Sequence, residues 1–288
     1  SHILLVEDNE LNQEMTVEIL AQAGLHTDVA NNGAEALSMV AQRPYDAVLM
    51  DCQMPVMDGY EATRRIRAQE RFRSLPILAM TANAMEADKE RCREAGMDDH
   101  IAKPLDVQQL FMTLQRWIRN PAEADTPALP VIDVAPLPHI DGLQLEVALQ
   151  RLGGNHALLH KLLQRFHDSQ AGVAAQIRSA LARAEQEEAV RLAHTLKGLA
   201  GNIGAYDLMH LAAELEAALR HQQQDQVPAA LAAVETDVAE LITALQAHQV
   251  AAAADLNSPS DGVVPAAVTN GLRELQRLLA NDDGAAGE

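Results

Sequence analysis

The sequence is poor in cysteine and in basic residues, and it has no long apolar run. Its two cysteines, Cys52 and Cys92, fall in stretches expected to be regular elements, so neither a disulfide framework nor a zinc site is predicted. Lysine and arginine number 22 against 41 aspartate and glutamate, a formal net charge of -19, which argues against binding nucleic acid or an anionic membrane. No apolar run approaches the ~20 residues that a membrane-spanning helix needs.

The chain opens with neither an initiator methionine nor a signal-peptide pattern. We therefore expect a piece of a longer protein, located in the cytoplasm, whose parent chain could be anchored in the inner membrane. This piece itself is expected to make no membrane contact.

Residues 1–118 alternate short apolar runs with amphipathic stretches. The runs expected to form strands are Ile3–Val6, Thr27–Ala30, Ala47–Met50, Ile77–Met80 and His100–Ala102. The stretches with helical periodicity are 10–23, 34–42, 60–70, 85–95 and 106–118. This alternation predicts an α/β doubly wound domain, with a five-stranded parallel sheet between two layers of helices.

The rest of the chain has no strand pattern. Residues 119–140 are rich in proline and predict a stiff, extended linker. Residues 141–250 predict an all-α bundle of four main helices and a short leading one. Breaks are expected near Gly153–Gly154, Ala184–Glu185, Gly204 and Pro228. Residues 251–288 are expected to be a low-complexity tail in which a new amphipathic helix starts.

Polar residues of complementary chemistry stand where the predicted strands end. Glu7 and Asp8 follow the first run, Asp51 and Thr81 follow two others, and Lys103 follows the last. The carboxyl ends of parallel strands form one edge of a sheet, so these side chains are expected to share a cleft. Three carboxylates together favour a hard divalent cation, with Mg²⁺ preferred over zinc. The lysine and the hydroxyl could then take the remaining oxygens of a phosphoryl group.

Four segments in this order resemble a response-regulator receiver domain, which has a flavodoxin-like fold. They are ILLVEDN, VLMDCQMPVMDG, LAMTANAM and IAKPLD, and the resemblance covers residues 2–118. It implies that Asp51 is a phosphoacceptor that attacks the phosphorus of a phosphohistidine. It also implies that Glu7, Asp8 and Asp51 hold Mg²⁺, with the backbone carbonyl of Gln53 as a further ligand.

The same resemblance assigns the other residues of the cleft. Lys103 would pair with the phosphoryl oxygens, and its bond to Pro104 would be cis. Thr81 would be the switch hydroxyl, helped by the backbone N–H of Ala82. His100 stands where receivers often carry tyrosine or phenylalanine, which leaves the amplitude of the switch open.

An aspartyl nucleophile also suits a second class, the phosphohydrolases that resemble the haloacid dehalogenase family. Those enzymes carry an acid/base aspartate two residues after the nucleophile. Here that position is Gln53, which cannot transfer a proton. Slow hydrolysis of a phosphoaspartate is compatible with this sequence, whereas fast phosphatase turnover is not.

His194 is the histidine that stands out in the helical part. Its helix carries one narrow apolar stripe, formed by Leu192, Leu196, Leu199 and Ile203. His194 points away from that stripe, so an exposed imidazole is expected. Its neighbours on the outer face are Arg191, Lys197, Gly198 and Gly201. Two glycines inside a helix cost roughly 1 kcal/mol each relative to alanine, and their bare backbone would let another protein's active site approach closely.

The segment AHTLKGLAGNIGA, residues 193–205, resembles the signature of histidine-containing phosphotransfer (Hpt) domains, over about residues 141–249. The resemblance implies a four-helix bundle in which His194 accepts phosphate through Nε2 and Lys197 stabilises that phosphate. Leu199 replaces a serine common in the motif, and its place on the apolar stripe predicts tighter packing there.

Together the two resemblances predict a two-component phosphorelay. A phosphoryl group would pass from an upstream histidine kinase domain to Asp51, then to His194, and on to a downstream response regulator. This order of domains resembles the C-terminal part of a hybrid sensor histidine kinase. No glycine-rich ATP-binding segment occurs, so this piece should not phosphorylate itself from ATP and its status as an enzyme stays open. The alternative is a receiver that only switches protein contacts, beside an Hpt domain that acts as a separate phosphate sink.

Overall fold

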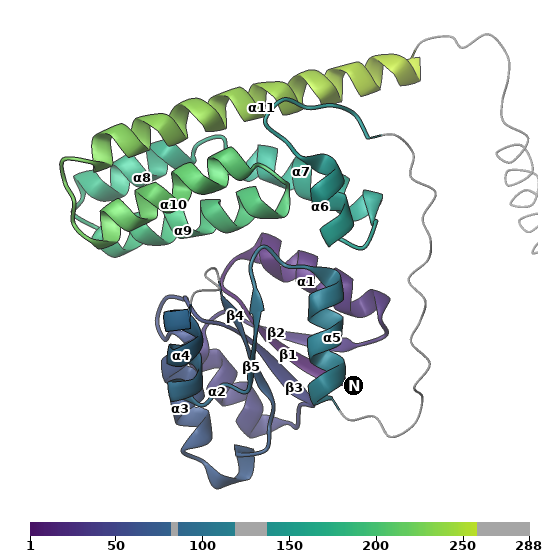
Figure 1. The fold of residues 1–288 in the computed structure, drawn as a ribbon, viewed down its shortest axis with the longest axis vertical. Coiled ribbons are helices and arrows are strands. Elements are labelled where there is room, and N and C mark those ends of the chain that lie inside the picture. Colours follow the sequence, from purple (N-terminus) through teal and green to yellow (C-terminus); the bar gives the residue numbers. More distant parts are fainter. Residues whose placement is uncertain (82–85, 119–136, 258–288) are drawn as a thin grey trace, which may run out of the picture. The chain divides into compact units, whose positions relative to one another are not determined.

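The computed structural model describes residues 1–81, 86–118 and 137–257. Its first part is a parallel sheet with the strand order β2-β1-β3-β4-β5 (Figure 1). The strands are β1 (His2–Val6), β2 (His26–Ala30), β3 (Ala47–Asp51), β4 (Ile77–Thr81) and β5 (Asp99–Ala102). The predicted five-stranded parallel sheet is confirmed.

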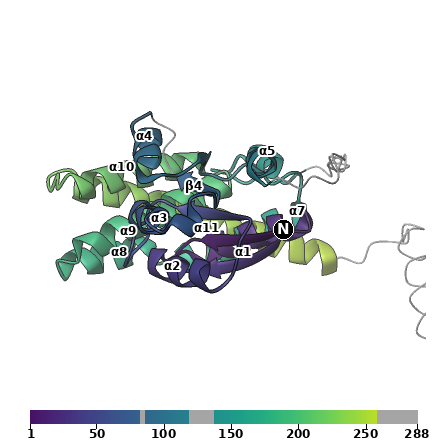
Figure 2. The same cartoon turned by 90° about the horizontal axis from the view of Figure 1, so that it is seen from below.

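Helices cover both faces of this sheet (Figures 1 and 2). They are α1 (Glu10–Gln22), α2 (Gly33–Gln42), α3 (Gly59–Arg67), α4 (Glu86–Ala95) and α5 (Val107–Trp117), with a short 3₁₀ turn, η1, at Glu70–Phe72. Successive strand residues point to opposite faces. Ile3 and Leu5 therefore pack with residues of α1 and α5, whereas Leu4 and Val6 pack with residues of α2 and α3.

Short polar residues start these helices just beyond the carboxyl ends of the strands. Asn9, Asn32, Asp58 and Asp106 each accept a hydrogen bond from a backbone N–H in the first turn of α1, α2, α3 and α5. Such caps satisfy donors that a helix end leaves open. The helices therefore begin on the same edge of the parallel sheet as the side chains at the strand ends.

Gly59 is required for the close approach of α3 to β3. A Cβ atom there would lie 2.1 Å from the backbone oxygen of Asp51. Because both partners are held by regular structure, Gly59→Ala is expected to destabilise the first domain by about 1–3 kcal/mol, as overpacking does. Denaturant unfolding measures this loss. Gly24→Ala is not a suitable control because its φ is positive, whereas Gly172→Ala has only a 3.9 Å contact and is expected to change stability far less.

The second part of the structure is all helical. Its helices are α6 (Leu145–Arg151), α7 (His156–Gln170), α8 (Val173–Ala182), α9 (Gln186–Asn202), α10 (Tyr206–Arg220) and α11 (Val227–Asn257). The predicted breaks at 153–154, 184–185 and 204 are present. Their core consists of leucine, alanine and a few larger residues, among which Phe166 is fully buried.

The predicted break around Pro228 is also present, at residues 221–226 between α10 and α11, and Pro228 itself lies in the first turn of α11, where its missing N–H is tolerated. Two details of the helical part differ from the prediction. A break at residues 171–172 separates α7 from α8, where Gly172 weakens the helix. Helix α11 also continues to Asn257, beyond the expected boundary at 250.

Some predictions fall outside the described residues. They concern residues 119–136 of the predicted linker, residues 258–288 of the predicted tail, and Ala82. Among the helices that are described, none combines the length and the apolar character needed to cross a membrane.

Candidate functional site

Three carboxylates meet at the carboxyl edge of the sheet. Glu7 and Asp8 directly follow β1, and Asp51 is the last residue of the neighbouring strand β3. One oxygen from each of the three lies within 4.8 Å of the others. Glu7 and Asp51 are buried, and Asp8 is partly buried. The parallel sheet thus places side chains 44 positions apart in the sequence in one cluster.

Lys103, just beyond the end of β5, bridges two of these carboxylates. Its Nζ donates hydrogen bonds to Asp51 Oδ2 and Glu7 Oε2, both at 2.6 Å. The position of the lysine is set by the backbone, since its N–H donates to the carbonyl of Thr81 at 2.8 Å. The peptide bond from Lys103 to Pro104 is cis, as the sequence resemblance implied.

The ionisation of this cluster reflects its burial. Burial raises the pKa of Asp51 to about 7, Lys103 opposes that rise, and Glu7 adds to it. Burial lowers the pKa of Lys103, but Asp51 and Glu7 more than compensate and raise it above its usual value. The lysine therefore stays charged at neutral pH.

The donor set fits a hard divalent cation. Burial raises the pKa of Asp8, and the negative charge of Glu7 raises it further. Among the described residues, Lys103 is the one cation in hydrogen-bond contact with these three acidic groups, so a cation with oxygen ligands would relieve their remaining repulsion. Carboxylate oxygens without nitrogen or sulfur donors suit Mg²⁺ better than zinc.

The remaining predicted cleft residues lie at neighbouring positions of the same edge. Thr81 is the buried last residue of β4. The backbone N–H of Gln53 donates to Asp51 Oδ1 at 3.1 Å, which orients the carboxylate. His100 lies on β5, half-buried, and its backbone N–H donates to Asp99 Oδ1 at 2.9 Å.

His194 lies in the middle of α9 and is held by an acidic residue of α10. Its Nδ1 lies 2.9 Å from Glu216 Oε1. The other oxygen of Glu216 accepts a hydrogen bond from Lys197 Nζ at 2.6 Å, and Arg220 Nη2 lies 2.8 Å from Oε1. One buried carboxylate thus organises an imidazole and two cationic side chains.

The expectation that the imidazole is exposed is wrong. Only 13% of the His194 side chain is accessible, because Glu216 closes its Nδ1 side. The predicted apolar stripe is otherwise present, with Leu196, Leu199 and Ile203 buried and Leu192 partly buried.

Glu216 was not predicted from the sequence. Its position could have indicated a buried acid, since Glu216 shares one helix face with Ala212 and Leu219, which are buried in the bundle. An acidic residue on a core-facing stripe needs a partner, and the histidine of the neighbouring helix provides one.

Cations hold the Glu216 carboxylate in its ionised form. Burial acts to raise its pKa, but the hydrogen bond from His194 and the charge of Lys197 lower it to about 2. An ionised carboxylate can only accept hydrogen bonds, so His194 Nδ1 carries a proton, and in the neutral form of the ring the lone pair is then on Nε2.

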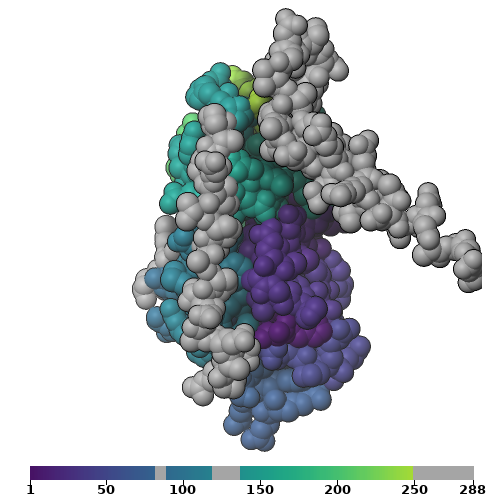
Figure 3. Space-filling view, turned by 90° about the vertical axis from the view of Figure 1, so that its right-hand side faces the viewer, coloured from purple at the N-terminus to yellow at the C-terminus, as the bar shows by residue number. Residues whose placement is uncertain are grey.

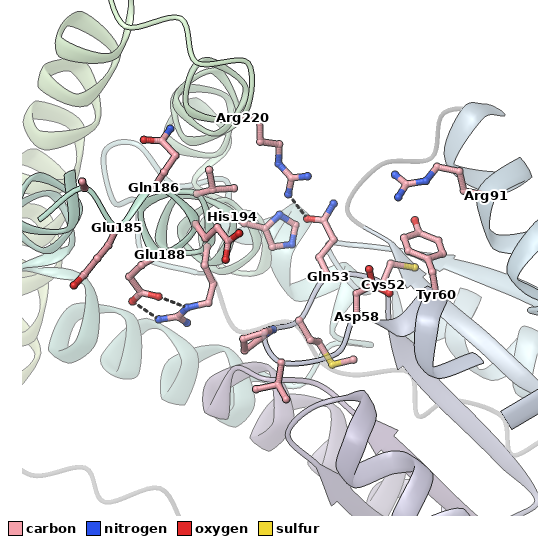
Figure 4. Close-up of a pocket in the computed structure, with 17 residues that line it drawn as sticks. Cys52, Gln53, Asp58, Tyr60, Arg91, Glu185, Gln186, Glu188, His194 and Arg220 are labelled. Atoms are coloured by element: carbon pink, nitrogen blue, oxygen red, sulfur yellow. Dashed lines mark hydrogen bonds and ion pairs between the residues drawn. The ribbon is translucent and has the colours of Figure 1, made fainter. Parts of the chain in front are cut away.

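His194 and the loop after Asp51 line the same cavity, whose volume is about 860 Å³. Figure 4 shows the imidazole of His194 facing Gln53 across this cavity, next to Arg220. Arg220 Nη2 donates to the side-chain oxygen of Gln53 at 2.7 Å, and Arg191 Nη1 lies 3.9 Å from Asp8 Oδ2. The histidine face and the loop after Asp51 therefore border one space, and Glu7 and Lys103 line a smaller cavity together with Gly198 and Asn202 of α9.

Of the two glycines on the histidine helix, Gly201 is the one that permits a close approach. A Cβ atom on Gly201 would lie 2.8 Å from Pro104 Cγ, beside Lys103. At Gly198 no atom of the described residues lies within 4 Å of such an atom. The predicted close approach to a glycine backbone is thus found only at Gly201 of these two positions, and the approaching residue is Pro104 of this same chain.

Comparisons with known proteins agree with both parts of the structure. Residues 3–115 match the family model described as response regulator receiver domain, and residues 161–248 match the model described as Hpt domain. The signal transduction histidine-protein kinase BarA of Shigella flexneri is 30% identical over 218 residues, which are 76% of this chain and 24% of BarA. The sensor protein GacS of Pseudomonas syringae pv. syringae is 41% identical over 153 residues, 50% of this chain and 17% of GacS.

A solved structure resembles the first part alone. It is the receiver domain of the sensor histidine kinase PA1611 from Pseudomonas aeruginosa, crystallised with a magnesium ion in its active site cleft. It is 49% identical and covers 41% of this chain and 96% of that one, with a TM-score of 0.39. The chain described here spans about a quarter of the length of BarA and less of GacS.

Proposed function

The chain belongs to the two-component signalling proteins, as a response regulator receiver domain followed by an Hpt domain, and we propose that it passes a phosphoryl group from Asp51 to His194. The observation that carries this proposal is the shared cavity, which His194 and the loop after Asp51 both line. The domain limits that we propose are 1–118 for the receiver and 141–250 for Hpt.

The first step loads the receiver. A carboxylate oxygen of Asp51 attacks the phosphorus of a phosphohistidine on an upstream kinase domain. The P–O bond to Asp51 forms as the P–N bond breaks, and the departing imidazole takes up a proton. Lys103 is already in hydrogen-bond contact with Asp51, so its charge is placed to stabilise the transferring oxygens.

Mg²⁺ is the cation that we propose for this cleft, where it would neutralise charge on the phosphoryl oxygens. Glu7, Asp8 and Asp51 would hold it, together with the backbone carbonyl of Gln53. Thr81 would supply the hydroxyl that responds to phosphate on Asp51.

The second step transfers the group to the helical domain. Nε2 of His194 attacks the phosphorus, the new P–N bond forms, and the P–O bond to Asp51 breaks to restore the carboxylate. Glu216 accepts a hydrogen bond from Nδ1–H and stabilises the imidazolium character that develops on the ring. Lys197, one turn along α9, offers a positive charge to the phosphate on the ring.

The onward partner would be the receiver of a downstream response regulator, and the upstream partner a histidine kinase domain of the same parent protein. We place both domains in the cytoplasm on this basis. The alternative, a receiver that only switches protein contacts, is less favoured because it gives no role to a phosphoacceptor histidine on the same cavity.

Phosphorylation by a small-molecule donor tests the internal relay. Purified chain is incubated with Mg²⁺ and acetyl phosphate, and phosphate is located by intact mass and peptide mapping. We expect phosphate on both Asp51 and His194 in the wild-type chain, on Asp51 alone in His194→Gln, and on neither residue in Asp51→Asn. Phosphate on His194 in the Asp51→Asn chain would exclude the proposed order of transfer. Phosphate that stays on Asp51 in the wild type would favour the alternative.

A further inference from the structure

Opposite charges face each other between the first helix of the receiver and the first long helix of the Hpt domain. On α1, Glu14 and Glu18 are one turn apart, and on α7, Lys161 and Arg165 are one turn apart. Each pair therefore forms a short charged stripe. The α7 stripe is basic in a chain that has only 22 lysines and arginines against 41 acidic residues.

The two stripes are in direct contact. Arg165 Nη2 donates to Glu14 Oε1 at 2.7 Å, and Lys161 Nζ lies 3.3 Å from Glu18 Oε2 and 3.6 Å from Glu14 Oε2. Glu14 thus interacts with both cations. The space-filling view shows the purple segment that contains α1 against the teal residues of the helical domain (Figure 3).

This contact is continuous with the face that carries the phosphoacceptor histidine. Asn202, at the end of α9, donates to Asn12 Oδ1 on α1 at 3.1 Å. Pro104 of the receiver lies against Gly201, the residue directly before Asn202 on α9. Engagement of α1 by α7 therefore fixes how the cleft meets α9.

We propose that Lys161 and Arg165 select the receiver that exchanges phosphate with His194, by pairing with acidic residues at the positions of Glu14 and Glu18. This role rests on the proposed relay, in which the contact would determine which receiver docks on the Hpt domain. A receiver with neutral or basic side chains at these two positions would dock poorly, because like charges would face each other. Since the pairs are partly exposed, they act mainly on partner choice and on the rate of productive docking, and less on the stability of the fold.

A charge swap in the whole chain tests this contact. The rate at which phosphate appears on His194 is measured after addition of acetyl phosphate and Mg²⁺, for wild type, Glu14→Arg, Arg165→Glu and the double variant. We expect each single variant to slow transfer by about fivefold to tenfold, and the double variant to return to within about twofold of wild type. Glu10→Arg is the matched control, because it makes the same charge change on α1 where the described residues show no ion pair.

The amount of phosphate on Asp51 shows whether each variant has an intact cleft. If Glu14→Arg loses this phosphate, Glu14→Gln replaces it and is expected to slow transfer by about twofold to threefold. Equal rates for Glu14→Arg and Glu10→Arg, or a double variant as slow as the singles, would overturn the proposal. If His194 of the wild-type chain gains no phosphate, the relay itself is contradicted. That result differs from those that contradict only the specificity contact, so the two proposals can be tested separately.

Discussion

Lys103→Met should lower the free energy of unfolding of the receiver by about 3 kcal/mol in the absence of divalent cations. The lysine is the one cation in hydrogen-bond contact with both Glu7 and Asp51 among the described residues, and both carboxylates are buried. Methionine has a similar length but no charge, so two buried acids would be left without their partner. The same substitution should slow phosphorylation of Asp51 by about 100-fold, which is the typical loss of rate when one group that stabilises the transition-state charge is removed.

Mg²⁺ should restore much of the stability that Lys103→Met loses. Because the cation would take over the neutralisation of the carboxylates, it should stabilise the variant more than the wild type. Trp117 is the only tryptophan of the chain and lies in α5 of the receiver, so its fluorescence reports this domain alone in denaturant unfolding. Arg73→Met is the control, since Arg73 is exposed and its loss should change stability by less than about 0.5 kcal/mol. Equal destabilisation with and without Mg²⁺ would contradict the proposed metal site.

The positions of the strands and the cleft could be predicted from the sequence because they depend on local pattern and chain order. Each strand is a short apolar run followed by a polar residue, and parallel strands put those polar residues at one edge. Asp51 and Lys103 therefore could be placed in one cleft without knowledge of their distance. The hydrogen bonds from Lys103 to the two acids could not be predicted, because they depend on the direction that the turn after β5 gives to the lysine side chain.

Features that depend on contacts between helices were less predictable. The exposure of His194 was overestimated because helix periodicity describes one helix, whereas Glu216 approaches from the neighbouring helix α10. The contact of Glu14 with Arg165 joins residues 151 positions apart, and no local pattern pairs them. The end of α7 was missed because a glycine does not always end a helix, as Gly198 and Gly201 inside α9 show, so Gly172 alone does not predict a break.

Glu216→Ala should slow transfer to His194 by about 10- to 100-fold, the loss seen when a partner that orients a functional imidazole is removed. The carboxylate accepts a hydrogen bond from Nδ1–H, with 2.9 Å between Nδ1 and Oε1, and so leaves Nε2 as the proposed nucleophile. Without it, the neutral ring can place its proton on Nε2, and Lys197 and Arg220 lose their shared anion. Glu216→Gln should have a smaller effect, because its amide oxygen can still accept a hydrogen bond from Nδ1–H but carries no charge.

The measurement follows phosphate on both acceptors in the same sample. The rate at which Asp51 becomes phosphorylated should be unchanged in both Glu216 variants, since the Glu216 carboxylate lies outside the receiver cleft. Glu214→Ala, an exposed acid two residues earlier on α10, is the control and should transfer at the wild-type rate. Normal transfer in Glu216→Ala would show that the carboxylate does not set the proton position of His194.

Acid unfolding gives an independent readout of the same contact. The pKa of Glu216 is lowered from 4.5 to about 2 in the folded chain, so its charge stabilises the fold above pH 4.5. That contribution, up to about 3 kcal/mol by linkage, is lost as the pH falls towards 2. The stability difference between wild type and Glu216→Gln should therefore be largest near neutral pH and shrink in acid. A difference that stays constant from pH 7 to pH 2.5 would mean that the ionised carboxylate is not what holds the His194 face together.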